Sequence, residues 1–255
     1  MGFAQYDVMD ETPRRRGFAH THVGRREQNE DSHLADNESG LFVVADGMGG
    51  YKGGEVASKI VVDRLAAFFS RTDRHDAGFD TLTVPDRPVV AERMLLAIRQ
   101  ANMEIQRRRR GHLARMGSTV AALLLRDDQA LIAHVGDSRV YRRRDGVLER
   151  MTVDHSVYTE MVESGMNRSS AQNYRHMITR AVGVPGSCQP DMQVVETAPN
   201  DMFLLCSDGV SDVLADADID DVMSEVSEEL VARTLVSRAY MRGADDNITA
   251  LVVVI

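Results

Sequence analysis

The most informative hydrophobic pattern in the chain is a run of five apolar residues, 41–45, that ends in an acid and a glycine-rich turn. The run reads Leu-Phe-Val-Val-Ala and predicts a buried strand. Asp46 follows directly, and three of the next four residues are glycines. Glycine lets the backbone turn sharply and approach a ligand without an obstructing Cβ atom. A carboxylate beside exposed carbonyls at a strand end suits a hard divalent cation.

Two amphipathic helices are predicted after this turn, and short strands follow them. Residues 54–71 and 88–110 carry apolar side chains on one face at helical spacing, and Pro88 suits a first helical turn. Beyond Gly117, short apolar segments alternate with turn residues, which indicates hairpins. The predicted strands are 17–24, 118–125, 130–135, 140–143, 147–151, 191–197, 202–206 and 248–255, and further helices are predicted at 157–164, 217–226 and 228–242.

Three segments lack this regular pattern. Residues 1–16 are polar and predict a loose tail or an edge segment. Residues 72–87 predict a loop because they are polar and contain proline. Residues 152–190 combine a short helix, closed by Gly165, with polar stretches. We interpret this last segment as a modestly packed insert over the sheet.

Composition and charge limit the class of protein. The chain has 255 residues, of which 43% are hydrophobic and 27% charged, enough for one large domain or two small ones with a real core. A formal net charge of -9 argues against nucleic-acid binding through phosphate neutralisation. Cys188 and Cys206 are too few for a disulfide framework, and the sequence shows no membrane-spanning run or signal peptide. We therefore predict a cytoplasmic protein with no membrane partner.

Acidic residues recur where predicted strands begin or end. Asp46, Asp137 and Asp208 each follow an apolar strand, and Asp246 precedes the last one. Asp137 alone is typical of a turn residue. Asp212 is interpreted as a residue that caps or opens the next helix. Four such positions together favour a shared metal site over four separate turns.

A dense polar segment at residues 24–33 has two interpretations. Without helical periodicity, it is compatible with an exposed loop. Alternatively, Arg26 binds a phosphate, because its planar guanidinium donates two parallel hydrogen bonds, while Glu30 and Asp31 lie near a cation. The residues alone leave both interpretations open.

The ordered motifs resemble the protein phosphatase 2C (PPM) family of metal-dependent serine/threonine phosphatases, in its compact bacterial form. The resemblance extends from about residue 17 to the end of the sequence. A match to any one of these short motifs is weak evidence for the family, whereas the whole set in family order is specific to it. The matching segments are Arg26-x-x-Asn29-Glu30-Asp31, Asp46-Gly47-Met48-Gly49-Gly50, Gly54-Glu55-x-Ala57-Ser58, Gly117-Ser118-Thr119, Gly136-Asp137-Ser138-Arg139, Ser207-Asp208-Gly209 and Asp246-Asn247.

The resemblance implies an α+β fold, a four-layer α-β-β-α sandwich of two antiparallel sheets flanked by helix pairs. It places this domain at residues 17–255 and a small flap subdomain at about 152–186. The grouping of strands apart from paired helices in the sequence agrees with this architecture.

The resemblance also implies the metal ligands. Asp46 would bridge two metal ions. Asp208 and Asp246 would complete the protein ligands of one ion, and the Gly47 carbonyl would bind the other. Asp137, with Asp208, would form a third and weaker site. Oxygen ligands of this kind favour Mn²⁺ or Mg²⁺ over Zn²⁺.

The remaining roles concern the substrate. By the resemblance, Glu30 and Asp31 would hold metal-bound waters, and Arg26 would bind the substrate phosphate. The implied reaction is hydrolysis of phosphoserine and phosphothreonine in proteins by a water that bridges the two ions, without a phosphoenzyme. The implied partners are phosphorylated proteins and a bacterial serine/threonine kinase that the enzyme opposes, and we expect a monomer.

The general acid is the one departure from the family pattern. Met48 stands where eukaryotic members have a histidine proposed to protonate the leaving alkoxide, and bacterial relatives share this methionine. A metal-bound water is the first candidate for this role and His33 the second. For His155 we expect a local turn contact rather than a part in catalysis.

Three other functions were weighed against a protein phosphatase. A P-loop is excluded because Lys52 is followed by Gly53 rather than by Ser or Thr. A catalytically inactive domain of the same fold, which binds phosphoproteins as a regulator, would be expected to have lost metal carboxylates. A hydrolase of small phosphorylated metabolites would use the same metal chemistry on a different substrate.

Overall fold

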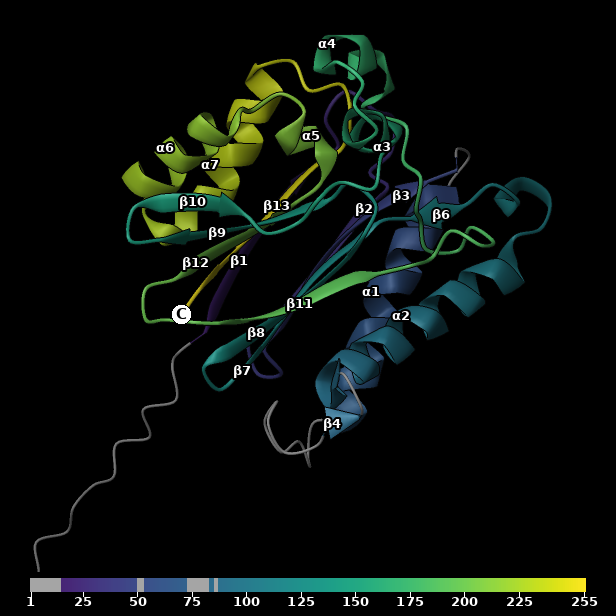
Figure 1. The fold of residues 1–255 in the computed structure, drawn as a ribbon, viewed down its shortest axis with the longest axis horizontal. Coiled ribbons are helices and arrows are strands. Elements are labelled where there is room, and N and C mark those ends of the chain that lie inside the picture. Colours follow the sequence, from purple (N-terminus) through teal and green to yellow (C-terminus); the bar gives the residue numbers. More distant parts are fainter. Residues whose placement is uncertain (1–14, 50–52, 73–82, 85–86) are drawn as a thin grey trace, which may run out of the picture.

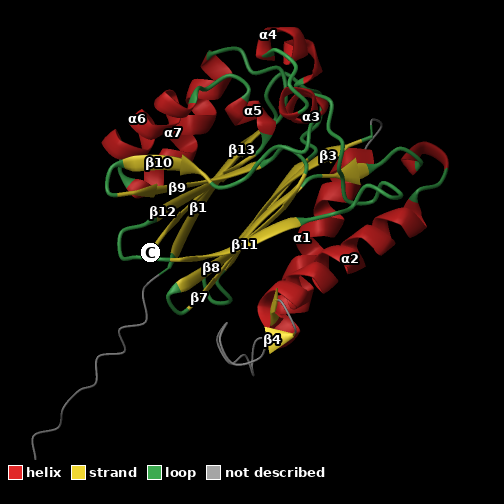
Figure 2. Ribbon diagram, viewed as in Figure 1, coloured by secondary structure: helices red, strands yellow, loops and turns green. Residues whose placement is uncertain are grey.

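Two antiparallel sheets pack face to face, and helices cover the outer face of each (Figures 1 and 2). The structure, a computed structural model, describes residues 15–49, 53–72, 83–84 and 87–255. This layer order confirms the predicted α-β-β-α sandwich. No helix among these residues is long and apolar enough to span a membrane.

Every strand pair in the two large sheets is antiparallel. The first sheet contains, in spatial order, β1 (Arg16–His22), β13 (Ile248–Val254), β12 (Met202–Cys206), β9 (Arg139–Arg144) and β10 (Val147–Arg150). The second contains β11 (Asp191–Glu196), β8 (Gln129–Val135), β7 (Val120–Arg126), β3 (Leu41–Met48) and β2 (Asp31–Asp36), with β6 (Gly117–Ser118) paired to β3.

The helices divide between the two outer layers. Helices α1 (Gly53–Thr72) and α2 (Val89–Arg108) cover the second sheet. Helices α5 (Asp208–Ser211), α6 (Asp216–Glu225) and α7 (Glu228–Met241) cover the first. The apolar faces of the longer helices, α1, α2, α6 and α7, pack on the sheets, as the helical spacing of the sequence predicted.

The continuous apolar sequence of β3 follows from burial on both of its faces. Leu41 and Val43 pack against the helices α1 and α2, whereas Phe42 and Val44 point into the layer between the sheets. Because successive side chains of a strand point to opposite faces, a strand between two apolar layers has no polar position to alternate with.

The layer between the sheets is apolar along most of its length and polar at one end. On β3, the inward positions are Phe42, Val44 and then Asp46. Three neighbouring strands repeat this order as they approach the same end. The inward positions are Leu123, Ala121 and Thr119 at β7, Phe203, Leu205 and Ser207 at β12, and Val253, Leu251 and Thr249 at β13. The fold therefore gathers polar side chains from several strands at one end of the sandwich.

A small subdomain projects beyond this end of the sandwich, at the top of Figure 1. It contains α3 (Val157–Glu163), α4 (Arg168–Ala171) and the 3₁₀ turn η3 (Gln172–Tyr174). An antiparallel β-bridge between Ser156 and Ile178 joins the two ends of this subdomain. A second β-bridge, between Ser118 and Val182, pairs the returning chain with the sandwich. We call residues 152–186 the flap.

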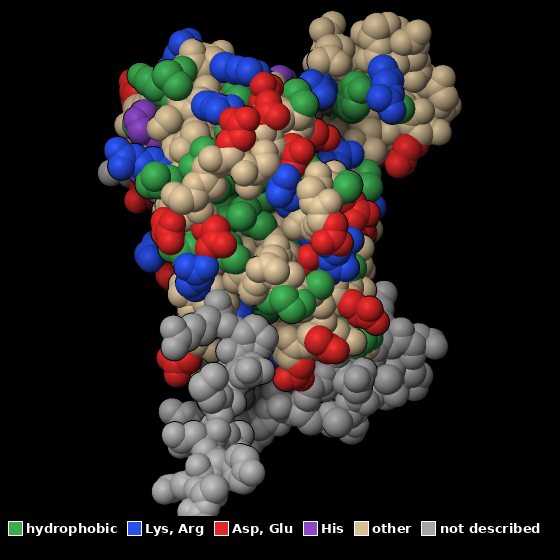
Figure 3. Space-filling model, turned by 90° about the vertical axis from the view of Figure 1, so that its left-hand side faces the viewer, with side chains coloured by type: hydrophobic (Ala, Val, Ile, Leu, Met, Phe, Trp, Pro, Cys, Tyr) green, Lys and Arg blue, Asp and Glu red, His purple; other side chains and the backbone are tan. Residues whose placement is uncertain are grey.

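Charged side chains are interspersed on the side of the molecule shown in Figure 3. Ion pairs connect secondary-structure elements to one another. Arg143 of β9, for example, donates to Asp220 of α6 at 2.8 Å. A half-buried pair at the surface contributes about 1 kcal/mol, so the sandwich depends mainly on its apolar layers.

The interpretation of segment 24–33 as an exposed loop fits only its first part, because Asp31 begins the edge strand β2. The expectation for Asp212 was wrong. Asp212 does not cap or open α6, whose N-cap is Ala215. Instead, Asp212 ends the single turn α5, which the sequence analysis missed because four residues are too few to show periodicity.

The predicted tail and the predicted loop lie mostly outside the described residues. Of the segment 1–16, the structure describes only the last two residues, and β1 already begins at Arg16. Of the segment 72–87, the described parts include β4 (Thr83–Val84), which pairs with β5 (Arg87–Pro88).

Candidate metal centre

The polar end of the sandwich begins with two aspartates on adjacent strands. Asp31 of β2 is the direct partner of Asp46 in the antiparallel register with β3. Oδ2 of Asp31 accepts hydrogen bonds from Ser207 Oγ at 2.9 Å and Thr249 Oγ1 at 2.6 Å. Its Oδ1 is buried without a hydrogen-bond partner in the described part of the chain. One oxygen of Asp31 is thus fixed from the opposite sheet, and the other is left over.

The segment Gly117-Ser118-Thr119 holds the backbone of Asp46. The amide of Asp46 donates to Thr119 Oγ1 at 2.9 Å, and its carbonyl accepts from Ser118 Oγ at 3.0 Å and the Thr119 amide at 2.8 Å. Thr119 Oγ1 also lies 2.7 Å from Ser138 Oγ, beside Asp137. These contacts use only backbone atoms of Asp46, so its carboxylate is positioned while its oxygens are kept for other partners.

Burial and mutual repulsion raise the pKa values of this group of carboxyls. The pKa of Asp46 is raised well above its usual range, first by burial and then by the charges of Asp31 and Asp208. Burial and the charge of Asp137 likewise raise the pKa of Asp208. Burial also raises the pKa of Asp31 to about 6, and burial with the Asp154 charge raises that of Asp137 to about 7. Ionising several buried carboxyls together is unfavourable in free energy, and a bound cation would offset their repulsion.

The donor set fits hard divalent cations. Asp208 Oδ1, like Asp31 Oδ1, is buried and has no hydrogen-bond partner among the described residues. Buried polar atoms are normally satisfied, so two orphaned carboxylate oxygens in one cluster point to a missing cationic partner. Carboxylate and carbonyl oxygens are the ligands that Mn²⁺ and Mg²⁺ prefer.

Glu30 joins this end of β3 to the start of α1. Its side chain accepts a hydrogen bond from the Gly54 amide at 3.1 Å, and its carbonyl accepts from the Gly47 amide at 3.2 Å. The packing is so close that a Cβ atom on Gly47 would lie 2.1 Å from the Gly54 carbonyl oxygen. Glycine is therefore required here because the backbones of β3 and α1 touch.

Arg26 lies against Asp246 rather than at a distance from the acids. Its Nη2 donates to Asp246 Oδ2 at 2.7 Å, and its Nε donates to the Asp245 carbonyl at 3.0 Å. Asp46, Asp208 and Asp246 are electrostatic neighbours. They are not among the triplets of described side chains whose ligand atoms all lie within 4.8 Å of one another. In this conformation a guanidinium pairs with Asp246 where the sequence predicted a metal ion.

Asn247 is a residue of the site whose role the sequence analysis missed. Its Oδ1 accepts from the Glu30 amide at 2.8 Å, and its Nδ2 donates to the carbonyls of Val23 and Gln28, both at 2.9 Å. Asn247 thus fastens the loop that carries Arg26 and Glu30 to the start of β13. The Asp246-Asn247 motif was visible in the sequence, but nothing local shows which loop the amide binds.

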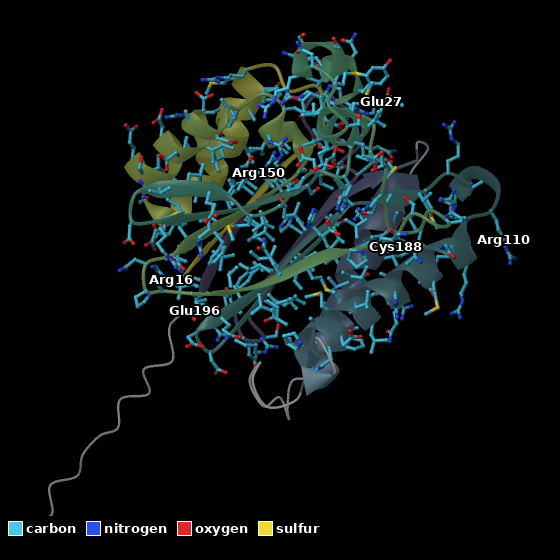
Figure 4. The ribbon with its side chains drawn as sticks, in the orientation of Figure 1. Arg16, Glu27, Arg110, Arg150, Cys188 and Glu196 are labelled. Carbon is cyan, nitrogen blue, oxygen red and sulfur yellow. The ribbon has the colours of Figure 1, made fainter. Side chains whose placement is uncertain are left out.

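A cavity beneath the flap adjoins the aspartates. Its lining includes Asp137, Asp208 and Asp212 from the sandwich, and Arg150, Tyr158 and Arg175 from the strand β10 and the flap. Figure 4 shows oxygen-bearing side chains gathered in this region, between the labelled Arg150 and Glu27. At the wall of the cavity, Arg139 binds Asp154 through two nitrogens, at 2.9 and 2.7 Å.

His155 contacts the turn that carries Asp137. Its Nδ1 accepts from the Gly136 amide at 3.1 Å, and its ring stacks on His134 with centroids 4.4 Å apart. Because Nδ1 accepts, the proton of the neutral ring is on Nε2, 3.1 Å from Asp191 Oδ2. His134, His155 and Asp191 bring potential ligand atoms within 4.8 Å, but this tautomer makes His155 a hydrogen-bond donor there. His33 is exposed, and no hydrogen bond in the described structure joins it to the carboxylates.

A four-layer sandwich with buried carboxylates and an arginine at one end suits the metal-dependent hydrolysis of phosphate esters. A family model for protein phosphatase 2C matches residues 16–242. The chain belongs to the protein phosphatase 2C family. It is a metal-dependent phosphatase, an enzyme of the bacterial type that the motifs predicted.

Three relatives illustrate the similarity. The chain is 32% identical to the serine/threonine phosphatase stp of Listeria monocytogenes over 240 residues, which cover 89% of this chain and 90% of that protein. It is 36% identical to the structure of PppA, a key regulatory component of T6SS in Pseudomonas aeruginosa, with a TM-score of 0.77 and coverage of 94% and 97%. It is 32% identical to the catalytic domain of the phosphatase PstP in complex with two manganese ions, with a TM-score of 0.80 and coverage of 94% and 99%.

Proposed function

We propose that this phosphatase removes phosphate from phosphoserine and phosphothreonine in proteins, with two Mn²⁺ or Mg²⁺ ions held by Asp46, the Gly47 carbonyl, Asp208 and Asp246. A third ion would bind Asp137 together with Asp208. The observation that carries this proposal is the cluster of buried aspartates with orphaned oxygens on Asp31 and Asp208. The manganese-containing PstP domain, similar to this chain over 94% of its length, supports it.

Metal ions in this position would lower the pKa of a bound water and offset charge on the phosphoryl oxygens. The protein's own residues supply the orientation. Ser207 and Thr249 fix one oxygen of Asp31, so that its second oxygen is free to accept a hydrogen bond from a water molecule. The side chain of Glu30, which accepts a hydrogen bond from the Gly54 amide at the first turn of α1, is also placed to accept a hydrogen bond from a water molecule.

Arg26 is proposed to exchange Asp246 for the substrate phosphate when the metal ions are bound. Its guanidinium donates to Asp246 in the structure, at 2.7 Å. A metal ion at Asp246 would take over the neutralisation of that carboxylate. The guanidinium would then be free to bind two oxygens of the substrate phosphate, for which its planar fork is suited. Metal binding would in this way prepare the phosphate site.

Hydrolysis of p-nitrophenyl phosphate and of a phosphothreonine peptide tests the proposal. We expect turnover with Mn²⁺, none in excess chelator, and a loss of at least about 100-fold in kcat/KM for Asp208→Ala. Asp63→Ala, which removes an exposed aspartate of α1, serves as the matched control. Turnover by Asp208→Ala equal to that of the wild type would contradict the proposed ligand set.

The substrate class needs its own comparison. A kcat/KM for a phosphothreonine peptide well above that for a sugar phosphate is expected of a protein phosphatase, and the reverse order would favour a hydrolase of small metabolites. The inactive regulatory domain would bind a phosphoprotein without turnover. The retained carboxylate cluster supports the active enzyme.

The physiological partner is proposed to be a serine/threonine kinase and its phosphorylated substrates, acted on by a monomer. Reversal of kinase autophosphorylation by the purified enzyme tests the first point. Light scattering coupled to size exclusion tests the second, since a monomer has a mass of 28.3 kDa. Autophosphorylation that persists in the presence of active phosphatase would contradict the kinase as a substrate.

A further inference from the structure

The histidine at the end of β1 binds the backbone of the loop that carries Arg26. His22 is the last residue of that strand, and its Nδ1 accepts a hydrogen bond from the Gly24 amide at 2.9 Å. Because Nδ1 accepts, the proton of the neutral ring is on Nε2. The imidazole therefore fixes the backbone two residues before Arg26.

A tyrosine of α7 fixes the orientation of this imidazole. The ring of Tyr240 lies against that of His22, with centroids 4.8 Å apart and planes tilted by 57°. A tilted contact is a favourable geometry between aromatic rings, and it limits rotation of the half-buried imidazole. Nδ1 is thus kept toward the Gly24 amide by a helix that belongs to the sandwich rather than to the loop.

The loop passes directly against the backbone of Asp246. Gly24 has a φ of +62°, and a Cβ atom on it would lie 1.9 Å from the Asp246 carbonyl oxygen. Glycine meets both conditions, because it tolerates a positive φ and has no Cβ atom. A shift of Gly24 would therefore move the Arg26 side chain relative to Asp246 and to the proposed metal ions.

The contact with His22 becomes more important once Arg26 leaves Asp246. In the structure, Nη2 of Arg26 donates to Asp246 at 2.7 Å. The proposed exchange of partners removes this contact, whereas the backbone contacts of the loop remain. One is the Gly24 amide on His22, and another is the carbonyl of the preceding residue, which accepts from Asn247 at 2.9 Å.

We propose that His22 is a positioning residue for the substrate phosphate. Through the Gly24 amide it holds the loop in the conformation that presents the guanidinium of Arg26 to the phosphate. This inference rests on the proposed function, in which Arg26 binds that phosphate. It assigns a role in substrate affinity to Nδ1 of His22 and to the Tyr240 ring that orients it, although neither side chain needs to touch the substrate.

Two substitutions of His22 separate its hydrogen bond from its ring. His22→Phe keeps an aromatic ring against Tyr240 and removes the acceptor. His22→Asn removes the ring and keeps an acceptor, because an asparagine oxygen can bind the amide two residues further on. The chain already uses this contact at the other end of the same loop, where Asn29 Oδ1 accepts from the Asp31 amide at 3.1 Å.

Steady-state kinetics on a phosphothreonine peptide in saturating Mn²⁺ compares these variants. His22→Phe should raise KM about three- to tenfold, the loss expected for one hydrogen bond, with kcat and Mn²⁺ affinity unchanged. His22→Asn should return KM close to that of the wild type. His20→Ala is the matched control, because His20 lies two positions earlier on the same face of β1 and makes no side-chain hydrogen bond in the described structure.

Three results would overturn the inference. The first is a wild-type KM for His22→Phe, and the second is the same raised KM for His22→Phe and His22→Asn. The third is a loss of kcat and of Mn²⁺ affinity alongside the change in KM, which would indicate a general structural role. Amide hydrogen exchange at Gly24 gives a readout without turnover, since it should be faster in His22→Phe than in the wild type and in His22→Asn.

Combination with Arg26→Ala shows whether His22 acts through Arg26. If it does, His22→Phe should change KM no further in the Arg26→Ala background, whereas independent effects would multiply and would overturn the inference. An unchanged KM for Arg26→Ala alone would contradict the proposed phosphate site. A raised KM for Arg26→Ala with a wild-type KM for His22→Phe would overturn the role of His22 alone, so the two failures are distinguishable.

Discussion

Asp31 and Asp46 are direct partners in the antiparallel register of β2 and β3, and the pKa of each is raised by burial together with the charges of neighbouring acids. Two carboxylates that face each other at the end of a strand pair repel one another and destabilise that strand pair unless a positive charge lies between or beside them. The arrangement therefore favours cation binding over stability, which is a common compromise at functional sites.

The first prediction concerns Asp137 and pH. Its pKa is about 7 in the folded protein, above its ordinary value, so the folded state binds more protons than the unfolded state between about pH 4 and 7. Its contribution to stability is therefore lost as the pH rises through that window. In chelator at pH 8, Asp137→Asn should be more stable than the wild type by an amount on the order of a few kcal/mol, and this advantage should vanish near pH 4.

Urea unfolding of both proteins at the two pH values measures this difference. Asp63→Asn is the matched control, because Asp63 is exposed and lies outside the buried group of carboxyls, so its substitution should change stability at pH 8 far less than Asp137→Asn does. A pH-independent difference between Asp137→Asn and the wild type would show that Asp137 is not held as an uncompensated buried acid.

The second prediction concerns the hydroxyl that fixes Asp31. Thr249→Val removes the donor 2.6 Å from Asp31 Oδ2 while keeping the shape of the side chain. Without this donor the charged form of Asp31 loses support, so kcat/KM in the presence of Mn²⁺ should fall about 10- to 100-fold. Steady-state kinetics on a phosphothreonine peptide checks this. Thr197→Val is the control, because Thr197 follows β11 at the end of the sheet away from the aspartates, where its amide donates to the Asp128 carbonyl at 2.7 Å. Wild-type kinetics for Thr249→Val would remove Asp31 from the proposed site.

The third prediction separates the two partners of Arg26. Arg26→Ala should raise KM for a phosphopeptide at least about tenfold, since the phosphate loses a bidentate donor. Mn²⁺ affinity should not fall, because the guanidinium competes with the ion for Asp246. Arg25→Ala is a close control, because Arg25 is the neighbouring residue and its side chain pairs with the exposed Asp245. Weakened Mn²⁺ binding in Arg26→Ala would contradict the exchange of partners.

The fourth prediction concerns His155, whose ring accepts from the Gly136 amide next to Asp137. His155→Ala should increase several-fold the Mn²⁺ concentration needed for half-maximal activity, because the turn that carries Asp137 loses this contact. At saturating Mn²⁺, kcat should return close to that of the wild type. His112→Ala, which removes an exposed histidine, is the control. An activation profile of His155→Ala identical to that of this control would limit His155 to a role in stability.

The sequence was most informative where both faces of a strand are buried. The strands β3 and β13 show continuous apolar runs because each lies between a helical layer and the other sheet. The carboxylates that follow or precede such runs stand out, so Asp46 and Asp246 could be singled out from sequence. The four-layer fold followed from the ordered motifs of the family.

The edge strand β2 and the single turn α5 could not be predicted in this way. β2 is half exposed and mostly polar, so it resembles a loop, and α5 is too short to show helical spacing. The contacts of Asn247 and of Arg26 join residues more than 200 positions apart in the chain. No local pattern encodes such pairings, because they exist only after the two sheets have packed.

Anomalous diffraction from crystals of the protein grown with Mn²⁺ tests the central claim most directly. We predict two strong manganese peaks on either side of Asp46, each about 2.1 Å from its carboxylate, with Asp246 released from Arg26. Asp208 and Asp246 should ligate one of the ions and the Gly47 carbonyl the other. Manganese bound only elsewhere, with Arg26 still paired to Asp246, would contradict the account.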